Sequence, residues 1–502
     1  MTIKWLRRVL VLMPAMFCLL SGCAMTPPPL KTAAERPSDA VAFFHNLDAA
    51  VAHWGVRDAA AAPVAGFPYL RADRFLAAMA PRRQDEGEAT AWIDAMAALD
   101  RDARRREIGN LPPVALADAP SGAGALGHGT RADLMALADR YAAELLAHDR
   151  RAPGYARAVA EAVSVPDEYR TAMRVAGLYP LAVVPVAVVT EHVNRRFVEW
   201  HRESWDRLET RGRLIRYDPA ASDLPPVDPR RIHAAQGRDP MGRPRLTADD
   251  ADALVWQFAP VIVQDTAAEY DRWGRVAWDG DLPQVNGAQP VIYHYISHAF
   301  FKGAPILQLN YTLWHPARQG PDAPRIEHGR LDGLTIRISL DTSGTPFMVD
   351  VMNNCGCYHF FVPKKGRILG VLPQPGALPP LVARWLPAAF PDERLLVRIS
   401  SGWHQAVHLA TAGAAADSPS RTYGLQSYET LERLPRGDGT SESLFDAEGI
   451  AKGSGRIEPY IFFSMGIPRI GSMRQRGRHA VRMVGRAHFD DPDLFDRIFR
   501  FK

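Results

Sequence analysis

The residues whose types and spacing best suit chemistry form the run Cys355-Gly356-Cys357-Tyr358-His359. If this run is an extended strand, its two-residue period places both thiols and the imidazole on one face. The Cα atoms of successive residues on that face are then about 6.6 Å apart. Three such ligands suit a divalent transition metal such as zinc. Gly356 could instead let the chain bend until the two sulfurs form a disulfide. In a third interpretation one cysteine is a nucleophile or part of a redox pair.

Two pairs of histidines, His294 with His298 and His404 with His408, are each four residues apart. On a helix this spacing places two imidazoles one turn apart, where they can share a metal ion. Both pairs fall in strand-like sequence, however, and four residues of strand cover about 13 Å. We therefore predict His294 and His298 as metal ligands only together with groups from neighbouring strands. The alternative is that hydrogen bonds satisfy these histidines on the faces of a sheet.

Glu327 and His328 lie in a glycine-punctuated connection, Ile326 to Gly333, just before a predicted strand. We assign Glu327 as the candidate general base, with His328 beside it, because a carboxylate next to a metal-bound water is the simplest hydrolytic pairing. A solvated turn explains the same residues. The sequence contains no G-x-S-x-G, H-E-x-x-H, P-loop or G-x-G-x-x-G string, which disfavours the common serine hydrolases, zinc peptidases and nucleotide enzymes. A metal-dependent hydrolase is the leading hypothesis.

Six arginines lie within eighteen residues that contain no acidic side chain, from Arg469 to Arg486. Guanidinium groups bind phosphates and carboxylates through two parallel hydrogen bonds. The candidate anion-binding residues are Arg474, Arg476, Arg478 and Arg482. In the alternative, these arginines pair with acidic residues of the protein itself. The corresponding second hypothesis for function is a non-enzymatic binding or scaffolding protein.

The N-terminus has the layout of a secretory signal: Lys4, Arg7 and Arg8 precede an uncharged stretch that ends in Leu20-Ser21-Gly22-Cys23. The run L-S-G-C resembles the lipobox of bacterial lipoproteins. That resemblance implies cleavage of residues 1–22, lipidation of Cys23 and attachment to a membrane through the acyl chains. Ala24 follows the cysteine where an aspartate would retain such a protein at the inner membrane. The implied location is therefore the periplasmic side of the outer membrane.

The motifs W-H-P, L-D-G-L-T and C-G-C-Y-H, between Trp314 and His359, resemble a group of proteobacterial envelope lipoproteins. This resemblance supports the location and names no substrate. In the envelope, the anionic partners implied for the arginines are lipid headgroups, lipopolysaccharide and peptidoglycan. Of 60 basic residues, Lys4, Arg7 and Arg8 would leave with the signal, so 57 basic residues would face 56 acidic ones. This near-neutral balance gives no support to a role in binding nucleic acid.

The composition of the chain changes near its middle, which predicts an α+β protein with a helical N-terminal domain and a mainly antiparallel β-sheet C-terminal domain. A proline-rich tether over 23–37 should precede a helical domain over 38–216, in which Phe44, Leu47 and Val51 form an apolar stripe. The uncharged stretch Val175 to Thr190 is expected to be a buried helix pair rather than a re-entrant membrane segment, because it is short and contains two prolines. Prolines and glycines over 217–245 indicate a linker.

Residues 246–502 are predicted to form the β-rich domain, with an arginine-rich segment and a helix at its end. Turn residues 302–305 and 341–344 should join two hairpins. The region Thr411 to Gly455 is expected to be a long surface excursion. The predicted strands are Val291 to Phe301, Ile306 to Trp314, Leu334 to Leu340, Phe347 to Met352 and Leu395 to Ile399.

Overall fold

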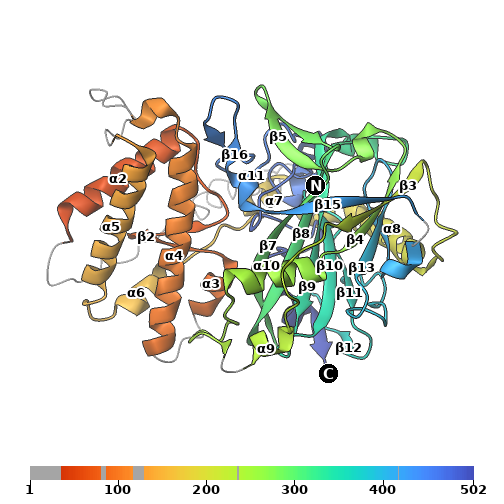
Figure 1. Ribbon diagram of the computed structural model, residues 1–502, viewed down its shortest axis with the longest axis horizontal. Coiled ribbons are helices and arrows are strands. Elements are labelled where there is room, and N and C mark those ends of the chain that lie inside the picture. The colour runs from red at the N-terminus through yellow and green to blue at the C-terminus, as the bar shows by residue number, and fades with distance from the viewer. Residues whose placement is uncertain (1–35, 81–85, 117–128, 235–236, 416–417) are drawn as a thin grey trace, which may run out of the picture.

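The structure is a computed structural model that describes residues 36–80, 86–116, 129–234, 237–415 and 418–502 (Figure 1). The predicted signal peptide, Cys23 and residues 24–35 of the tether lie outside these ranges. The described chain contains both helices and a mainly antiparallel sheet, as the α+β prediction requires.

The N-terminal helices share one apolar core, and Figure 1 shows them to one side of the large sheet. Phe44, Leu47 and Val51 are buried there, as their helical spacing predicts. Thr130 and Asp133 form a reciprocal capping box that fixes where one of the helices begins. The elements are α2 (Ser38–His53), β1 (Ala62–Val64), β2 (Phe67–Ala72), α3 (Arg74–Met79), α4 (Glu86–Asn110), α5 (Arg131–Asp149) and α6 (Tyr155–Ala162).

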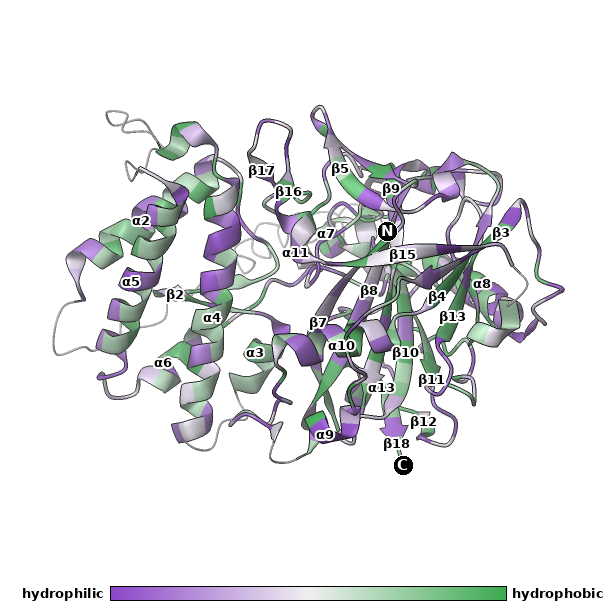
Figure 2. Ribbon diagram, in the orientation of Figure 1, coloured by the Kyte–Doolittle hydropathy of each residue, from purple (hydrophilic) through white to green (hydrophobic). Residues whose placement is uncertain are grey.

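Ten strands form one mixed sheet in the order β11-β10-β9-β8-β7-β15-β3-β4-β13-β14. Six of its neighbouring pairs are antiparallel and three are parallel. Figure 2 shows that β11 and β13 are strongly hydrophobic. The strands are β3 (Arg213–Pro219), β4 (Val261–Thr266), β7 (Val291–Phe301), β8 (Ala304–Arg318), β9 (Gly329–Leu340), β10 (Pro346–Asn353), β11 (Phe360–Pro363), β13 (Leu395–Ile399), β14 (Ala406–Thr411) and β15 (Ser420–Ser427).

All five predicted strands are present, and β7 and β13 have the predicted bounds. The hairpin between β7 and β8 turns at Lys302 and Gly303, whose φ angles are 51° and 76°. Two consecutive residues with positive φ match the twist of a two-residue hairpin. The second predicted hairpin, between β9 and β10, is also present.

Five strands of the sheet lie where no strand was predicted: β3, β4, β11, β14 and β15. The region Thr411 to Gly455 does not form a surface excursion throughout, because β15 lies in the middle of the sheet, parallel to both β3 and β7. β3 begins in the range expected to be helical and ends in the predicted linker. These pairings join segments that are far apart in the chain, so local sequence carries little signal for them.

The sheet is strongly curved, and helix α8 (Tyr179–Arg202) covers its two edges. The ring of His201 in α8 lies 5.0 Å from that of Phe360 in β11 and 6.4 Å from that of His408 in β14. β11 and β14 are the first and last strands of the sheet, so both edges approach the same helix. Helix α10 (Ala248–Phe258) adds Leu254, Val255 and Phe258 to the enclosed core.

Smaller elements complete the described chain. These are α7 (Thr171–Ala176), α9 (Pro229–His233), α11 (Glu429–Glu432), α12 (Glu458–Ile461), α13 (Leu494–Ile498), β5 (Arg275–Asp279), β6 (Leu282–Asn286), β12 (Ile368–Val371), β16 (Leu434–Pro435), β17 (Ser441–Glu442), β18 (Phe499–Phe501) and the 3₁₀ turns η2 (Pro113–Leu116), η4 (Glu269–Asp271), η5 (Arg325–Glu327), η6 (Ala412–Ala415) and η7 (Phe463–Met465). Among the described helices, none combines the length and the hydropathy needed to cross a bilayer.

Candidate anion-binding site

The predicted general base, Glu327, is held inside the protein by hydrogen bonds. It lies in η5, and Arg318 donates to its carboxylate at 2.5 Å and the indole of Trp403 at 3.0 Å. The hydroxyl of Tyr358 donates to the second carboxylate oxygen. The neighbouring His328 contacts the backbone oxygen of Ala323 at 3.1 Å. A carboxylate with three donors already bound is poorly placed to accept a proton from water.

Arg318 also belongs to a buried network around Asp332. It donates to both carboxylate oxygens of Asp332, at 2.9 and 2.8 Å. The ring of His404 bridges Asp332 at 2.8 Å and Asp271 at 3.1 Å. Burial alone would lower the pKa of His404, but the hydrogen bonds to the two carboxylates outweigh it and raise that pKa. The network is fully satisfied, as a buried polar cluster must be to stabilise a fold.

The segment Cys355 to His359 is not an extended strand, so the period-two argument for a shared face was wrong. Gly356 and Tyr358 have φ angles of 91° and 57°, which turn the chain between β10 and β11. Cys355 and Cys357 are free thiols, and the backbone N–H of Cys357 donates to the sulfur of Cys355 at 3.4 Å. The imidazole of His359 is separately bound to Asp350 at 2.8 Å.

His294 and His298 lie on β7, as the strand interpretation requires. His294 lines a pocket of about 440 Å³ beside Asp252 and Trp256, and the ring of His298 lies 5.4 Å from that of Phe75. Burial lowers the pKa of His298 to about 3, so its imidazole is neutral. Within the described part of the chain, no group of three or more histidine, cysteine or acidic side chains has the geometry to hold a metal.

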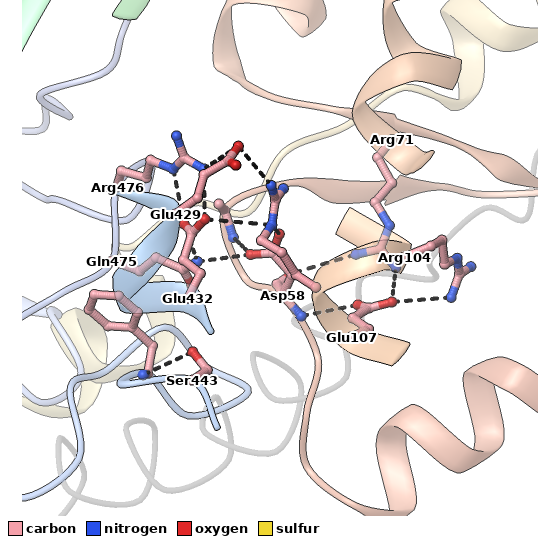
Figure 3. Close-up of polar contacts among 12 residues, drawn as sticks. Asp58, Arg71, Arg104, Glu107, Glu429, Glu432, Ser443, Gln475 and Arg476 are labelled. Carbon is pink, nitrogen blue, oxygen red and sulfur yellow. Dashed lines mark hydrogen bonds and ion pairs between the residues drawn. The ribbon is translucent and has the colours of Figure 1, made fainter. Parts of the chain in front are cut away.

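Three of the four predicted anion-binding arginines pair with acidic residues of the protein itself. Glu168 binds Arg474 and Arg478, each at 3.0 Å. Glu432 binds Arg476 at 2.7 Å, and Figure 3 shows this pair next to Glu429 and Asp58. Burial would lower the pKa of Arg476, yet the pKa is raised because the charge of Glu432 outweighs it. These arginines connect the C-terminal segment to the rest of the fold, and acidic residues of the protein itself already compensate their charges.

The fourth, Arg482, lines an open pocket of about 510 Å³ with Arg174, Arg486 and Arg497. Gln374 and Tyr179 also line this cavity, which we call the arginine pocket. Among the described residues that line it, none is acidic. Gly485 allows one wall to form, because a Cβ atom at this position would lie 2.4 Å from the side chain of Ala377.

Two guanidinium groups of the arginine pocket keep an unneutralised charge. Arg174 donates to the backbone oxygens of Met465 and Gly485, and Arg482 donates to the side chain of Gln374. Neither arginine forms an ion pair with an acidic residue of the described chain. Burial lowers the pKa of each of them. By contrast, Arg486 pairs with Asp167, and Arg497 pairs with Asp491. The pocket therefore has a net positive charge that a bound anion would compensate.

Sequence reasoning missed Arg174, which comes from α7, about 300 residues before Arg482. One signal was available: Arg174 is the only charged residue between Thr171 and Thr190. A single charge in an otherwise apolar segment needs either a partner or solvent.

Searches against protein-family models, curated proteins and solved structures find no match for this chain.

Proposed function

We propose that this chain is a lipoprotein of the outer membrane, anchored through Cys23 on the periplasmic side, that binds an anionic envelope component in the arginine pocket. The proposal includes a helical N-terminal domain, from α2 to α6, that precedes the β-rich domain; α8 and β3 are assigned to the β-rich domain, because α8 covers the edges of the sheet and β3 pairs within it. The observation that carries the proposal is the cavity of about 510 Å³ with four arginines and no acidic lining residue among those described.

The chemistry of the pocket favours a phosphate or carboxylate group. A guanidinium presents its N–H groups in a flat fork that matches two oxygens of such an anion. Burying a charge without a partner is costly, and Arg174 and Arg482 are both partly desolvated without a carboxylate to pair with. A bound anion would offset this desolvation cost. Lipid headgroups, lipopolysaccharide and peptidoglycan all present suitable anions in the proposed compartment.

The hydrolase hypothesis has less support from the described residues. Glu327 is bound to Arg318, and His359 is bound to Asp350. A pocket of about 50 Å³ reaches Trp403, but neither His404 nor Asp332 lines it. A hydrolase would need space for substrate beside its base. We therefore place binding ahead of hydrolysis.

The binding proposal is tested by titrating the purified mature protein with glycerol phosphate in a calorimeter. Arg482→Gln removes a charge that the fold does not neutralise, and we expect it to weaken binding by about ten- to a hundredfold, as for a lost charged hydrogen bond. Arg157→Gln is the matched control, because that arginine is 83% exposed and lies outside the pocket. Equal affinities for the wild type and Arg482→Gln would refute the proposal.

The anchor is tested separately by mass spectrometry of protein from bacterial membranes. Acyl chains at Cys23 and the absence of residues 1–22 are the expected results. A free thiol at this position, or an intact N-terminal methionine, would refute the anchor and leave the binding test unaffected.

A further inference from the structure

Helices α7 and α8 expose the apolar stretch that we expected to be buried. Among the described residues 171–196, none is buried. Leu181, Val184 and Val188, which follow one another around α8 at helical spacing, are 72%, 60% and 63% exposed. The outward face of α8 becomes charged only from Glu191 onward. The half of α8 nearest its N-terminus therefore presents an apolar stripe to its surroundings.

A second exposed apolar segment lies against these helices. η7 contacts both α7 and α8, and α12 adjoins η7. Gly177, at the end of α7, allows the close approach, because a Cβ atom there would lie 2.5 Å from the Cα atom of Ser464. We call the resulting surface the apolar face. Its exposed residues are Val175, Leu178, Leu181, Val184, Val188, Val189, Ile457, Tyr460, Ile461 and Phe463.

The apolar face adjoins the arginine pocket. Arg174 of α7 and Tyr179 at the start of α8 both line that pocket, and the guanidinium of Arg174 lies 4.3 Å from the ring of Tyr179. Between Thr171 and Thr190 the sequence has no acidic residue, and the only one between 457 and 466 is Glu458, which is 6% exposed. Exposed apolar side chains and unneutralised cations thus form one continuous surface.

We infer that the apolar face docks on a bilayer that contains anionic phospholipid, with the arginine pocket at the level of the headgroups. Apolar side chains bordered by arginines are the composition of surfaces that lie in a membrane interface. Tyr460, which is 86% exposed, has the amphipathic side chain that is enriched at that depth. The face carries no exposed carboxylate that could pair with the arginines of a second copy of this chain.

This inference rests on the proposed anchor and explains what the anchor alone does not. Twelve residues lie between Cys23 and Arg36, so the chain between them spans at most about 45 Å when extended. A tether of this length keeps the protein near the membrane without selecting which side faces it. Docking of the apolar face would select the orientation and would bring lipid headgroups to the arginine pocket.

The test measures the binding of unlipidated protein to vesicles. The full mature chain with Cys23→Ser is mixed with vesicles of phosphatidylethanolamine and phosphatidylglycerol, and bound protein is sedimented. The combined variant Leu181→Gln, Val184→Gln and Val188→Gln should weaken binding about a hundredfold, because each change removes apolar area from the contact. Glutamine favours helix more than valine does, so α8 should persist. Binding of glycerol phosphate should be unchanged in this variant.

The matched control replaces three exposed apolar residues outside the apolar face, Val41→Gln, Val114→Gln and Leu282→Gln, which are 41%, 57% and 43% exposed. Vesicle binding by this control should equal that of the wild type. Equal binding by the α8 variant, or equal losses in both triple variants, would overturn the inference. So would a dimer that forms in solution and disappears only in the α8 variant, without vesicle binding. If glycerol phosphate fails to bind while vesicle binding still depends on α8, the pocket proposal fails and the docking inference holds.

Discussion

The buried network around Asp332 allows a quantitative test of whether the predicted hydrolytic region is structural. Asp332→Asn keeps the shape of the side chain and removes its charge. Arg318 then retains Glu327 as its only acidic partner, and His404 retains Asp271. The side chain of Asp332 is 0% exposed and that of Arg318 is 3% exposed, so solvent cannot replace the lost interaction.

The expected loss follows from this burial. Removing one partner of a buried ion pair costs about 3–5 kcal/mol in the free energy of unfolding. At roughly 2 °C of melting temperature for each kcal/mol, the midpoint should fall by roughly 6–10 °C. Thermal unfolding followed by circular dichroism measures this shift. Binding of glycerol phosphate below the transition should be unchanged, because the arginine pocket lies elsewhere.

Asp322→Asn is the matched control. Asp322 forms a similar two-bond pair with Arg211, at 2.8 and 2.9 Å, but these side chains are 27% and 44% exposed. An exposed pair contributes up to about 1 kcal/mol, so the midpoint should change by roughly 2 °C or less. If the two variants melt at the same temperature, the structural interpretation of the Asp332 network is refuted.

Three further predictions concern the same region. The pKa of His404 is raised above its ordinary 6.5 in the folded protein, so its stabilising charge is fully present below pH 6.5 and is lost as pH rises through the raised value. The difference in free energy of unfolding between wild type and His404→Gln, measured in urea, should therefore shrink as pH rises. A difference that stays constant with pH would contradict the charged state of His404. Cys355 and Cys357 are free, so thiol titration of the denatured mature chain with Cys23→Ser, which lacks residues 1–22, should find two thiols without reductant, whereas a disulfide would leave none. Because Glu327 and His359 are bound to Arg318 and Asp350, elemental analysis should find less than one equivalent of zinc; a full equivalent that is lost in Cys357→Ser would restore the hydrolase hypothesis.

The strands that sequence predicted well carry their own local signals. Val291–Phe301 and Leu395–Ile399 are rich in β-branched and aromatic residues, and the first ends at a Lys-Gly turn. β15 carries no such signal: among its described residues only Tyr423 is buried, and Gly424 interrupts it. Its position depends on parallel neighbours from distant parts of the chain, β3 and β7.

The limits of the site prediction have the same physical origin. The spacing of arginines was visible in the sequence, but the carboxylates that neutralise three of them were not. Glu168 lies 306 residues before Arg474 in the chain, and no local pattern connects the two. The expected shared face of Cys355, Cys357 and His359 does not form for a local reason, since Gly356 and Tyr358 have positive φ angles and turn the chain.

The exposed valines and leucines of α8 require an explanation outside the fold. Valine is a poorer helix former than glutamine, and a side chain that is 60% exposed contributes little to the core. Folding alone therefore favours polar residues at Leu181, Val184 and Val188. We expect the free energy of unfolding of the triple glutamine variant to equal or exceed that of the wild type. A clear loss of stability would mean that the stripe packs within the protein, and the docking inference would then lose its physical basis.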